Sequence, residues 1–186
     1  GQLRSNRTVQ KGGRDRRVDA PRQPADHAMV AHALANLRDW KAAGRIRYVG
    51  ISTSEYGHFE QMETLARTED LDFIQINYGV ADTLAGDRVI PAAADHGVAV
   101  MANSPFGDGR YFSRLGSREL PEWAAEIECE SWAQFSLKYI LAHPAVTCVL
   151  TETTKPVHME DNLQAGFGRL PDSATKQRMR KFAAGL

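Results

Sequence analysis

Short side chains that form hydrogen bonds follow four apolar segments of the sequence. They make up the groups Ser52-Thr53-Ser54, Gln75-Asn77-Tyr78, Asn103-Ser104-Pro105-Phe106 and Glu152-Thr153-Thr154. Hydroxyl, amide and carboxyl groups can bind the phosphates, hydroxyls and amides of a polar ligand. We therefore expect a ligand site if the fold brings these groups to one edge.

Gln75 lies inside the apolar run "FIQIN". A buried amide needs partners for both its oxygen and its nitrogen. Two interpretations stay open: neighbouring backbone groups satisfy the amide, or the amide binds a similar group on a ligand.

Two turn-like stretches favour an anion. In "SPFGDGR", Gly107 and Gly109 would let backbone N–H groups approach a charge, although most Gly-x-Gly turns are only turns. Pro156 suits the first turn of a helix, and we predict that Thr153 or Thr154 caps it. Free N–H groups at a helix start attract anions. These features suit a nucleotide-like ligand, without separating a nicotinamide dinucleotide from a sugar phosphate.

The elements that must position these groups alternate along the chain. Strands are predicted at 45–52, 71–78, 98–106 and 145–152. Helices are predicted at 27–44, 55–68 after a Ser54 cap, 83–97 and 130–143, with two more starting near Pro156 and Pro171. Such a pattern is typical of a parallel α/β fold. These folds bind ligands at the carboxyl ends of their strands, whether the sheet is open or closed into a barrel.

Composition fits a soluble domain with one core: 186 residues, 42% hydrophobic and 25% charged. A net charge of zero gives no reason to expect nucleic acid or an anionic membrane as partner. No apolar run approaches the roughly 20 residues of a membrane span. Cys129 and Cys148 form no CxxC pair, and we interpret them as reduced thiols of a cytoplasmic protein.

Residues 1–26 differ from the rest of the chain, and we separate them from a domain at 27–186. They hold seven Lys or Arg and three Asp, and their only sizeable apolar residues are Leu3, Val9 and Val18. Such a segment cannot offset the entropy of ordering, so we predict disorder. The chain begins at Gly1 without Met, so a truncated or misjoined, artefactual start is the alternative.

Four segments in order resemble the aldo-keto reductase superfamily: "LRDWKAAGRIRYVGIS", "DFIQINY", "ANSPFG" and "TETTKPVHMEDN". The resemblance covers about residues 28–170. It implies an oxidoreductase that reduces a small carbonyl substrate with a nicotinamide dinucleotide, usually NADPH. It also implies a (β/α)8 (TIM) barrel, of which the four predicted strands would form an incomplete, C-terminal half.

The resemblance implies cofactor-binding roles near the nicotinamide. Ser52 and Thr53 match a pair that holds the carboxamide, with Thr53 replacing the family's Asn, and Gln75 matches a carboxamide-binding Gln. Asn103 stands where an aromatic residue usually stacks on the nicotinamide. Ser104 and Phe106 match positions near the pyrophosphate.

At the adenosine end, Thr153 matches a phosphate-contacting residue and His158 replaces a frequent Arg. Asp161 and Asn162 match the Glu-Asn pair that reads the adenine. Glu152 stands where Lys or Gly is common. Its carboxylate would repel a 2′-phosphate and accept a hydrogen bond from a free 2′-hydroxyl, so we expect a weaker preference for NADPH and tolerance of NADH.

The family's catalytic Asp, Tyr, Lys and His come from its first four strands, and we predict no catalytic residue here. The family's His ends an apolar strand ahead of the first helix, where this sequence is Arg-rich and has no predicted strand. The tyrosines fall in the wrong part of the pattern. We interpret His27 and His32 as solvated, not as metal ligands. Without the tyrosine, a bound cofactor has no placed proton donor.

Three alternatives stay open. The chain is a C-terminal fragment of an oxidoreductase, or a non-catalytic nucleotide-binding module that can self-associate through open strand edges, or a barrel enzyme for a sugar phosphate. Arg110, Tyr111 and Trp123, in the variable segment 108–128, either line a substrate pocket or pack on the barrel rim. The substrate itself cannot be predicted.

Overall fold

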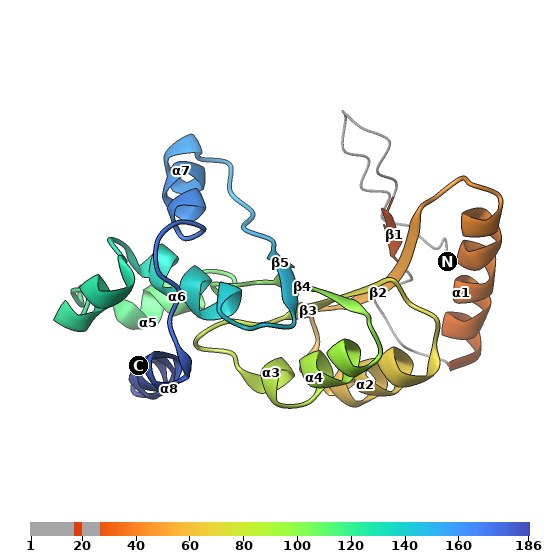
Figure 1. Cartoon of the computed structure of the whole chain (residues 1–186), viewed down its shortest axis with the longest axis horizontal. Coiled ribbons are helices and arrows are strands. Elements are labelled where there is room, and N and C mark those ends of the chain that lie inside the picture. The colour runs from red at the N-terminus through yellow and green to blue at the C-terminus, as the bar shows by residue number, and fades with distance from the viewer. Residues whose placement is uncertain (1–16, 20–26) are drawn as a thin grey trace. The chain divides into compact units, whose positions relative to one another are not determined.

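A computed structural model describes residues 17–19 and 27–186. Its strands are β1 (Arg17–Asp19), β2 (Tyr48–Thr53), β3 (Phe73–Asn77), β4 (Ala99–Asn103) and β5 (Val146–Val149). They follow one another across a single sheet in chain order (Figure 1). The β1–β2 and β2–β3 pairs are parallel. The predicted α/β class with a parallel sheet is confirmed.

Helices separate the strands. They are α1 (His27–Ala42), α2 (Phe59–Thr68), α3 (Leu84–Asp87), α4 (Val89–Asp95), α5 (Arg110–Leu115), α6 (Trp132–Leu141), α7 (Pro156–Gln164) and α8 (Ser173–Ala184). Short 3-10 helices lie at Tyr56–His58 and Glu122–Ile127. This β/α succession is that of a partial (β/α)8 barrel.

The chain divides into two compact units. The first contains the described residues up to Ile76 together with Arg88–Val100, and the second contains Asn77–Asp87 together with Met101–Leu186. Strands β3 and β4 each begin in the first unit and end in the second.

The first unit buries the apolar faces of its helices and strands. Leu34 of α1 and Ile74 of β3 are fully buried. Helices α2 and α4 pack against each other (Figure 1). Both oxygens of Asp72 accept from Lys41 Nζ at 2.7 Å, and Oδ2 also accepts from the Val49 N–H at 2.7 Å. The Asp72 carboxylate thus links the end of α1 to the start of β2 through hydrogen bonds.

The second unit has its core around α6. Phe135 is fully buried, and its ring lies 5.3 Å from that of Trp132, which stacks on Phe182 at 5.4 Å. Lys138 is also fully buried, yet its Nζ donates to the Phe167 oxygen at 2.7 Å and to the Arg169 oxygen at 2.9 Å. A buried cation requires such partners.

Strand β1 corrects the sequence prediction, because it lies in the segment expected to lack order and adds a fifth strand to the predicted four. It pairs with β2 from Arg17↔Tyr48 to Asp19↔Gly50. The strand RVD has one apolar residue, so no hydrophobic pattern in the sequence predicts it. It is recognised only by its pairing with β2. The rest of residues 1–26 lies outside the described residues, and disorder there stays a prediction.

Three further local predictions were wrong. The helix expected at 83–97 is two helices separated at Arg88, whose φ and ψ are −138° and −60°. Helix α2 starts after a 3-10 turn with His58 as its N-cap, so Ser54 does not cap it. The variable segment 108–128, for which no helix was predicted, contains α5 and the second 3-10 helix.

Among the described residues, no helix combines the length and the apolar character that spanning a bilayer requires.

Candidate functional site

In the first unit, Ser52 lies near the end of β2, and its neighbour on β3 is Gln75, the third of five residues of that strand. They are register partners in the parallel pair, so their side chains share one face of the sheet. Ser52 is 6% exposed, and within residues 17–19 and 27–186 its Oγ has no hydrogen-bond partner. Gln75 is half-buried. A buried hydroxyl without a partner costs free energy that a polar ligand can recover.

Thr53 follows Ser52 but uses its hydroxyl differently. Its Oγ1 accepts from the Glu55 N–H at 3.1 Å and lies 3.3 Å from His58 Nδ1. Thr53 pairs with Ile76 and therefore lies on the face opposite Ser52. Its hydroxyl stabilises the loop after β2, so Ser52 and Gln75 are the better placed pair for a carboxamide.

In the second unit, β4 ends in a tight turn. Asn103 Oδ1 is buried, and no described residue bonds to it. Ser104 has a φ of 47°, in the left-handed region, and its backbone oxygen accepts from the Gly107 N–H at 2.9 Å. The Gly109 N–H donates to Phe106 at 3.1 Å. Because these two N–H groups bond within the turn, the structure favours the alternative that this Gly-x-Gly stretch is only a turn.

Phe106 anchors the same turn through its ring. The ring is half-buried and lies 5.0 Å from that of Phe112, with the planes tilted by 44°. The Phe106 oxygen also accepts from the Tyr111 N–H at 3.2 Å, which joins the turn to α5.

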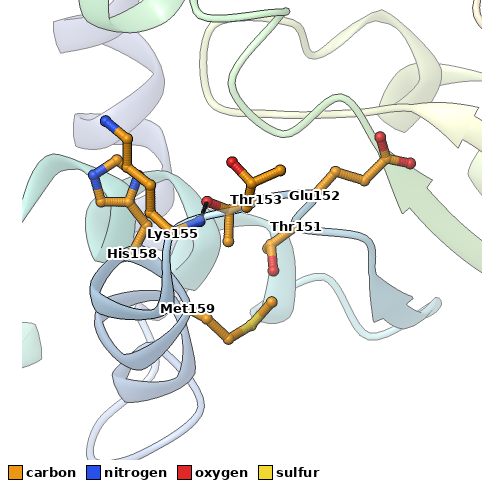
Figure 2. Close-up of a pocket in the computed structure, with 7 residues that line it drawn as sticks. Thr151, Glu152, Thr153, Lys155, His158 and Met159 are labelled. Carbon is orange, nitrogen blue, oxygen red and sulfur yellow. Dashed lines mark hydrogen bonds between the residues drawn. The ribbon is translucent and has the colours of Figure 1, made fainter.

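The second unit also contains a pocket, between the end of β5 and the start of α7 (Figure 2). Its volume is about 580 Å³. It is lined by Thr151, Glu152, Thr153, Thr154, Lys155, His158 and Met159. Four predicted site residues, Glu152, Thr153, Thr154 and His158, therefore share one pocket.

Helix α7 starts in this pocket without a side-chain cap. Lys155 is its N-cap and makes no capping hydrogen bond through its side chain, and Pro156 is the first helical residue. Thr153 Oγ1 accepts from the Lys155 N–H at 3.2 Å, one residue before the helix, so neither Thr153 nor Thr154 is the predicted cap. The starts of α6 and α8 are capped, by Ser131 and Asp172. An uncapped helix start attracts an anion.

The basic and the acidic side chains of the pocket point in opposite directions. In Figure 2, Lys155 and His158 extend to one side and the Glu152 carboxylate extends to the opposite side. All three are exposed, and no ion pair joins any of them to another described residue. The basic side lies at the positive end of α7, which favours a phosphate there.

Asp161 and Asn162 lie further along α7 and do not line the pocket. The Asp161 carboxylate accepts from Ser131 Oγ at 2.7 Å and from Gln134 Nε2 at 2.6 Å. Asn162 is 9% exposed. Both Asp161 oxygens thus bond to α6 and its cap, a use that the sequence analysis missed because Ser131 and Gln134 lie about thirty positions earlier.

Of the three residues that could line a substrate pocket or pack on the barrel rim, Tyr111 and Trp123 pack on the protein. Tyr111 is buried, and the Trp123 ring lies 5.5 Å from that of Phe135 and 4.3 Å from the Arg178 guanidinium carbon. Arg110 Nε donates to the Gly107 oxygen at 2.9 Å. Within the part of the chain that the structure describes, no group of three His, Cys, Asp or Glu residues could hold a metal ion.

Comparison with known proteins identifies the family of the chain. The profile of the Aldo/keto reductase family matches residues 17–181. The chain belongs to the aldo-keto reductase family. The match begins at β1, ten residues before the predicted domain boundary at residue 27. Among curated proteins, no sequence matches the chain.

Solved aldo-keto reductases share the fold. The apo form of AKR11C1 from Bacillus halodurans has a TM-score of 0.64 and 20% identity, over 89% of this chain and 60% of its own. A Klebsiella pneumoniae enzyme in complex with NADPH has a TM-score of 0.62 and 19% identity, over 83% and 53%. Another from Klebsiella pneumoniae, with NADP and acetate, has a TM-score of 0.67 and 21% identity, over 87% and 56%. This chain therefore spans about 60% or less of these proteins.

Proposed function

We propose that this chain binds a nicotinamide dinucleotide for the carbonyl chemistry of an aldo-keto reductase. The observation that carries the proposal is the pocket at the uncapped start of α7, where Lys155 and His158 lie beside threonine hydroxyls. A dinucleotide needs such a site for a phosphate. The Klebsiella pneumoniae relatives bound to NADPH and to NADP support the choice of cofactor.

The nicotinamide end would use Ser52 and Gln75. Their side chains share one face of the sheet, and the Ser52 hydroxyl is buried without a described partner. A carboxamide offers both a donor and an acceptor, which these two side chains can satisfy. Asn103 remains a proposed contact near the nicotinamide, and Ser104 and Phe106 remain proposed contacts near the pyrophosphate.

Reduction of a carbonyl also needs a proton donor, and no tyrosine of this chain is suited to that role. Burial raises the pKa of Tyr78, Tyr111 and Tyr139 and separates them from solvent. Tyr48 and Tyr56 are exposed on the surface. Strand β1 precedes α1, where the family's histidine is expected, but residues 17–26 contain no histidine. We therefore propose cofactor binding by this chain without turnover on its own.

Titration of the purified chain with NADPH, followed by tryptophan fluorescence, tests the proposal. Lys155→Met should weaken binding, because it removes a cation from the start of α7. Lys181→Met is the matched control, since Lys181 is an exposed lysine of α8 that does not line the pocket. Equal affinity in both variants, or no binding by the unmodified chain, would contradict the proposal. Turnover of simple aldehydes would contradict the absence of catalysis.

Glu152 bears on the choice between NADPH and NADH. Its exposed carboxylate lines the pocket and points away from Lys155 and His158 (Figure 2). We propose that the basic side binds a phosphate of the dinucleotide while Glu152 accepts from a ribose hydroxyl. A 2′-phosphate near Glu152 would be repelled, so NADH is tolerated beside NADPH.

A second candidate function is self-association through apolar surface. Large apolar side chains of α7 and of the link to α8 are exposed, namely Val157, Met159, Leu163, Phe167 and Leu170. Strand β5 is the last in the sheet order, and its residues are half-buried or exposed. Sedimentation of the chain over a range of concentrations, with Leu163→Glu as the disrupting variant, distinguishes a self-associating chain from a monomer.

A further inference from the structure

Two side chains at the start of α6 bind one carboxylate of α7. Ser131, the N-cap of α6, accepts from the Gln134 N–H at 3.1 Å and donates through Oγ to Asp161 Oδ2 at 2.7 Å. Gln134 accepts from the Glu130 N–H at 2.9 Å and donates through Nε2 to Asp161 Oδ1 at 2.6 Å. The residues that cap α6 are therefore also the residues that bind α7.

This arrangement fixes α7 more strongly than a single contact would. The two donors reach different oxygens of Asp161, so they restrict rotation of α7 about its axis as well as its distance from α6. The carboxylate also lies at the positive end of α6, which favours its charge. Hydrogen bonds to a carboxylate are stronger than those between neutral groups. Gln134 is 3% exposed, so solvent competes little for its side chain.

The helix that Asp161 fixes to α6 also contributes residues to the pocket. His158 precedes Asp161 by one helical turn, and Lys155 is the residue from which α7 starts. Rotation of α7 would therefore displace the His158 side chain, which lines the pocket. Ser131 and Gln134 themselves do not line it.

We propose that Ser131, Gln134 and Asp161 are positioning residues for the nucleotide-binding pocket, acting through the orientation of α7. Asp161 then accepts hydrogen bonds from Ser131 and Gln134 and does not bind the adenine. The inference rests on the proposed function, because it assigns these three residues to the pocket that would hold the adenosine phosphate.

The test compares Ser131→Ala and Gln134→Ala with Asp172→Ala in the full chain. Asp172 is the matched control, because it caps α8 through the Thr175 N–H at 2.8 Å and does not line the pocket. Two quantities are measured: the dissociation constant for adenosine 2′,5′-bisphosphate and the urea midpoint. We expect Ser131→Ala and Gln134→Ala to weaken binding about tenfold, as for loss of a hydrogen bond to a charged group, and Asp172→Ala to leave binding unchanged.

Conservative variants separate positioning from a loss of stability. Ser131→Thr keeps the hydroxyl and should bind the bisphosphate as tightly as the unmodified chain. Asp161→Asn keeps one good acceptor, so its dissociation constant should lie between those of the unmodified chain and Ser131→Ala. Amide exchange of residues 157–160 should rise in Ser131→Ala and not in Asp172→Ala. Equal dissociation constants across the set, or unchanged exchange in α7, would overturn the inference. Failure of the unmodified chain to bind the bisphosphate, NADPH and NADH alike would overturn the proposed function instead. The exchange result would then decide whether Ser131 orients α7.

Discussion

The two regions proposed to bind the cofactor are built on different physical principles. Ser52 and Gln75 are placed by backbone pairing of parallel strands, and Ser52 is closed off from water. The Glu152–His158 pocket is open, and exposed side chains at a helix start determine its chemistry. The first region should therefore respond to changes of strand geometry, and the second to changes of charge.

The largest effect should come from Gly50→Ala, which tests the strand-built region. A Cβ at Gly50 would collide with the Phe73 backbone oxygen and ring, two positions before the Ser52↔Gln75 pair. We expect a loss of about 3 kcal/mol in the free energy of unfolding, because a backbone contact cannot relax easily. Urea denaturation measures it. Gly57→Ala is the control, since no atom lies within 4 Å of its added Cβ. Similar midpoints in both variants would mean that the strands tolerate the extra carbon.

Glu152→Lys tests the charge-built region. Reversal of this charge should shift the ratio of NADPH to NADH affinity about tenfold toward NADPH, through attraction of the 2′-phosphate, and added salt should reduce the shift. The two dissociation constants provide the measurement. Glu160→Lys makes the same charge change at an exposed position of α7 outside the pocket. A shift of the same size in Glu160→Lys would assign the effect to net charge and not to the pocket.

A smaller effect should separate the adjacent hydroxyls Ser52 and Thr53. Ser52→Ala removes a buried hydroxyl without a described partner, so the chain should be equally stable or more stable by up to about 1 kcal/mol. NADPH binding should weaken about fivefold. Thr53→Val should instead destabilise the chain by about 1 kcal/mol, because the Glu55 N–H loses its acceptor. Thermal unfolding and NADPH titration distinguish them. A stability loss in Ser52→Ala would show that its hydroxyl has a structural partner.

The smallest effect should be the pH dependence of the cap of α8. The Thr175 backbone N–H, which donates to Asp172, lowers the pKa of that carboxyl below its ordinary value. A lowered folded-state pKa gives stability that is present above the ordinary carboxyl pKa and is lost as the pH falls through the lowered one. Asp172→Asn should therefore melt about 2 °C or less below the unmodified chain at pH 7. The difference should shrink in acid. A gap that does not change with pH would exclude this linkage.

Much of the fold could be predicted because its signals are local. Strands β2 to β5 lie inside the four predicted apolar segments, except that β2 extends one residue further, to Thr53. Strand β1 could not be predicted in this way, because one valine gives no pattern and the strand exists through its pairing with β2. Helices α3 and α4 share a continuous apolar pattern, and only the backbone angles at Arg88 separate them.

The site could be predicted less completely, because its decisive contacts are between distant residues. Ser52 and Thr53 look alike in sequence, and only the sheet shows which hydroxyl has a local partner. Asp161 has its partners on α6 and at its cap, and no spacing near Asp161 signals them. Glu152, Thr153, Thr154 and His158 lie within seven positions of one another, so the sequence indicated their common location.

The buried side chain of Lys138 has a consequence for local opening of the chain. Its two carbonyl partners belong to Phe167 and Arg169, in the link between α7 and α8. If the link moved away without α6, a cation that is buried in the native chain would lose both of its hydrogen-bond acceptors at once. The link and α6 should therefore open to solvent as one cooperative segment, with similar protection of their amides from exchange.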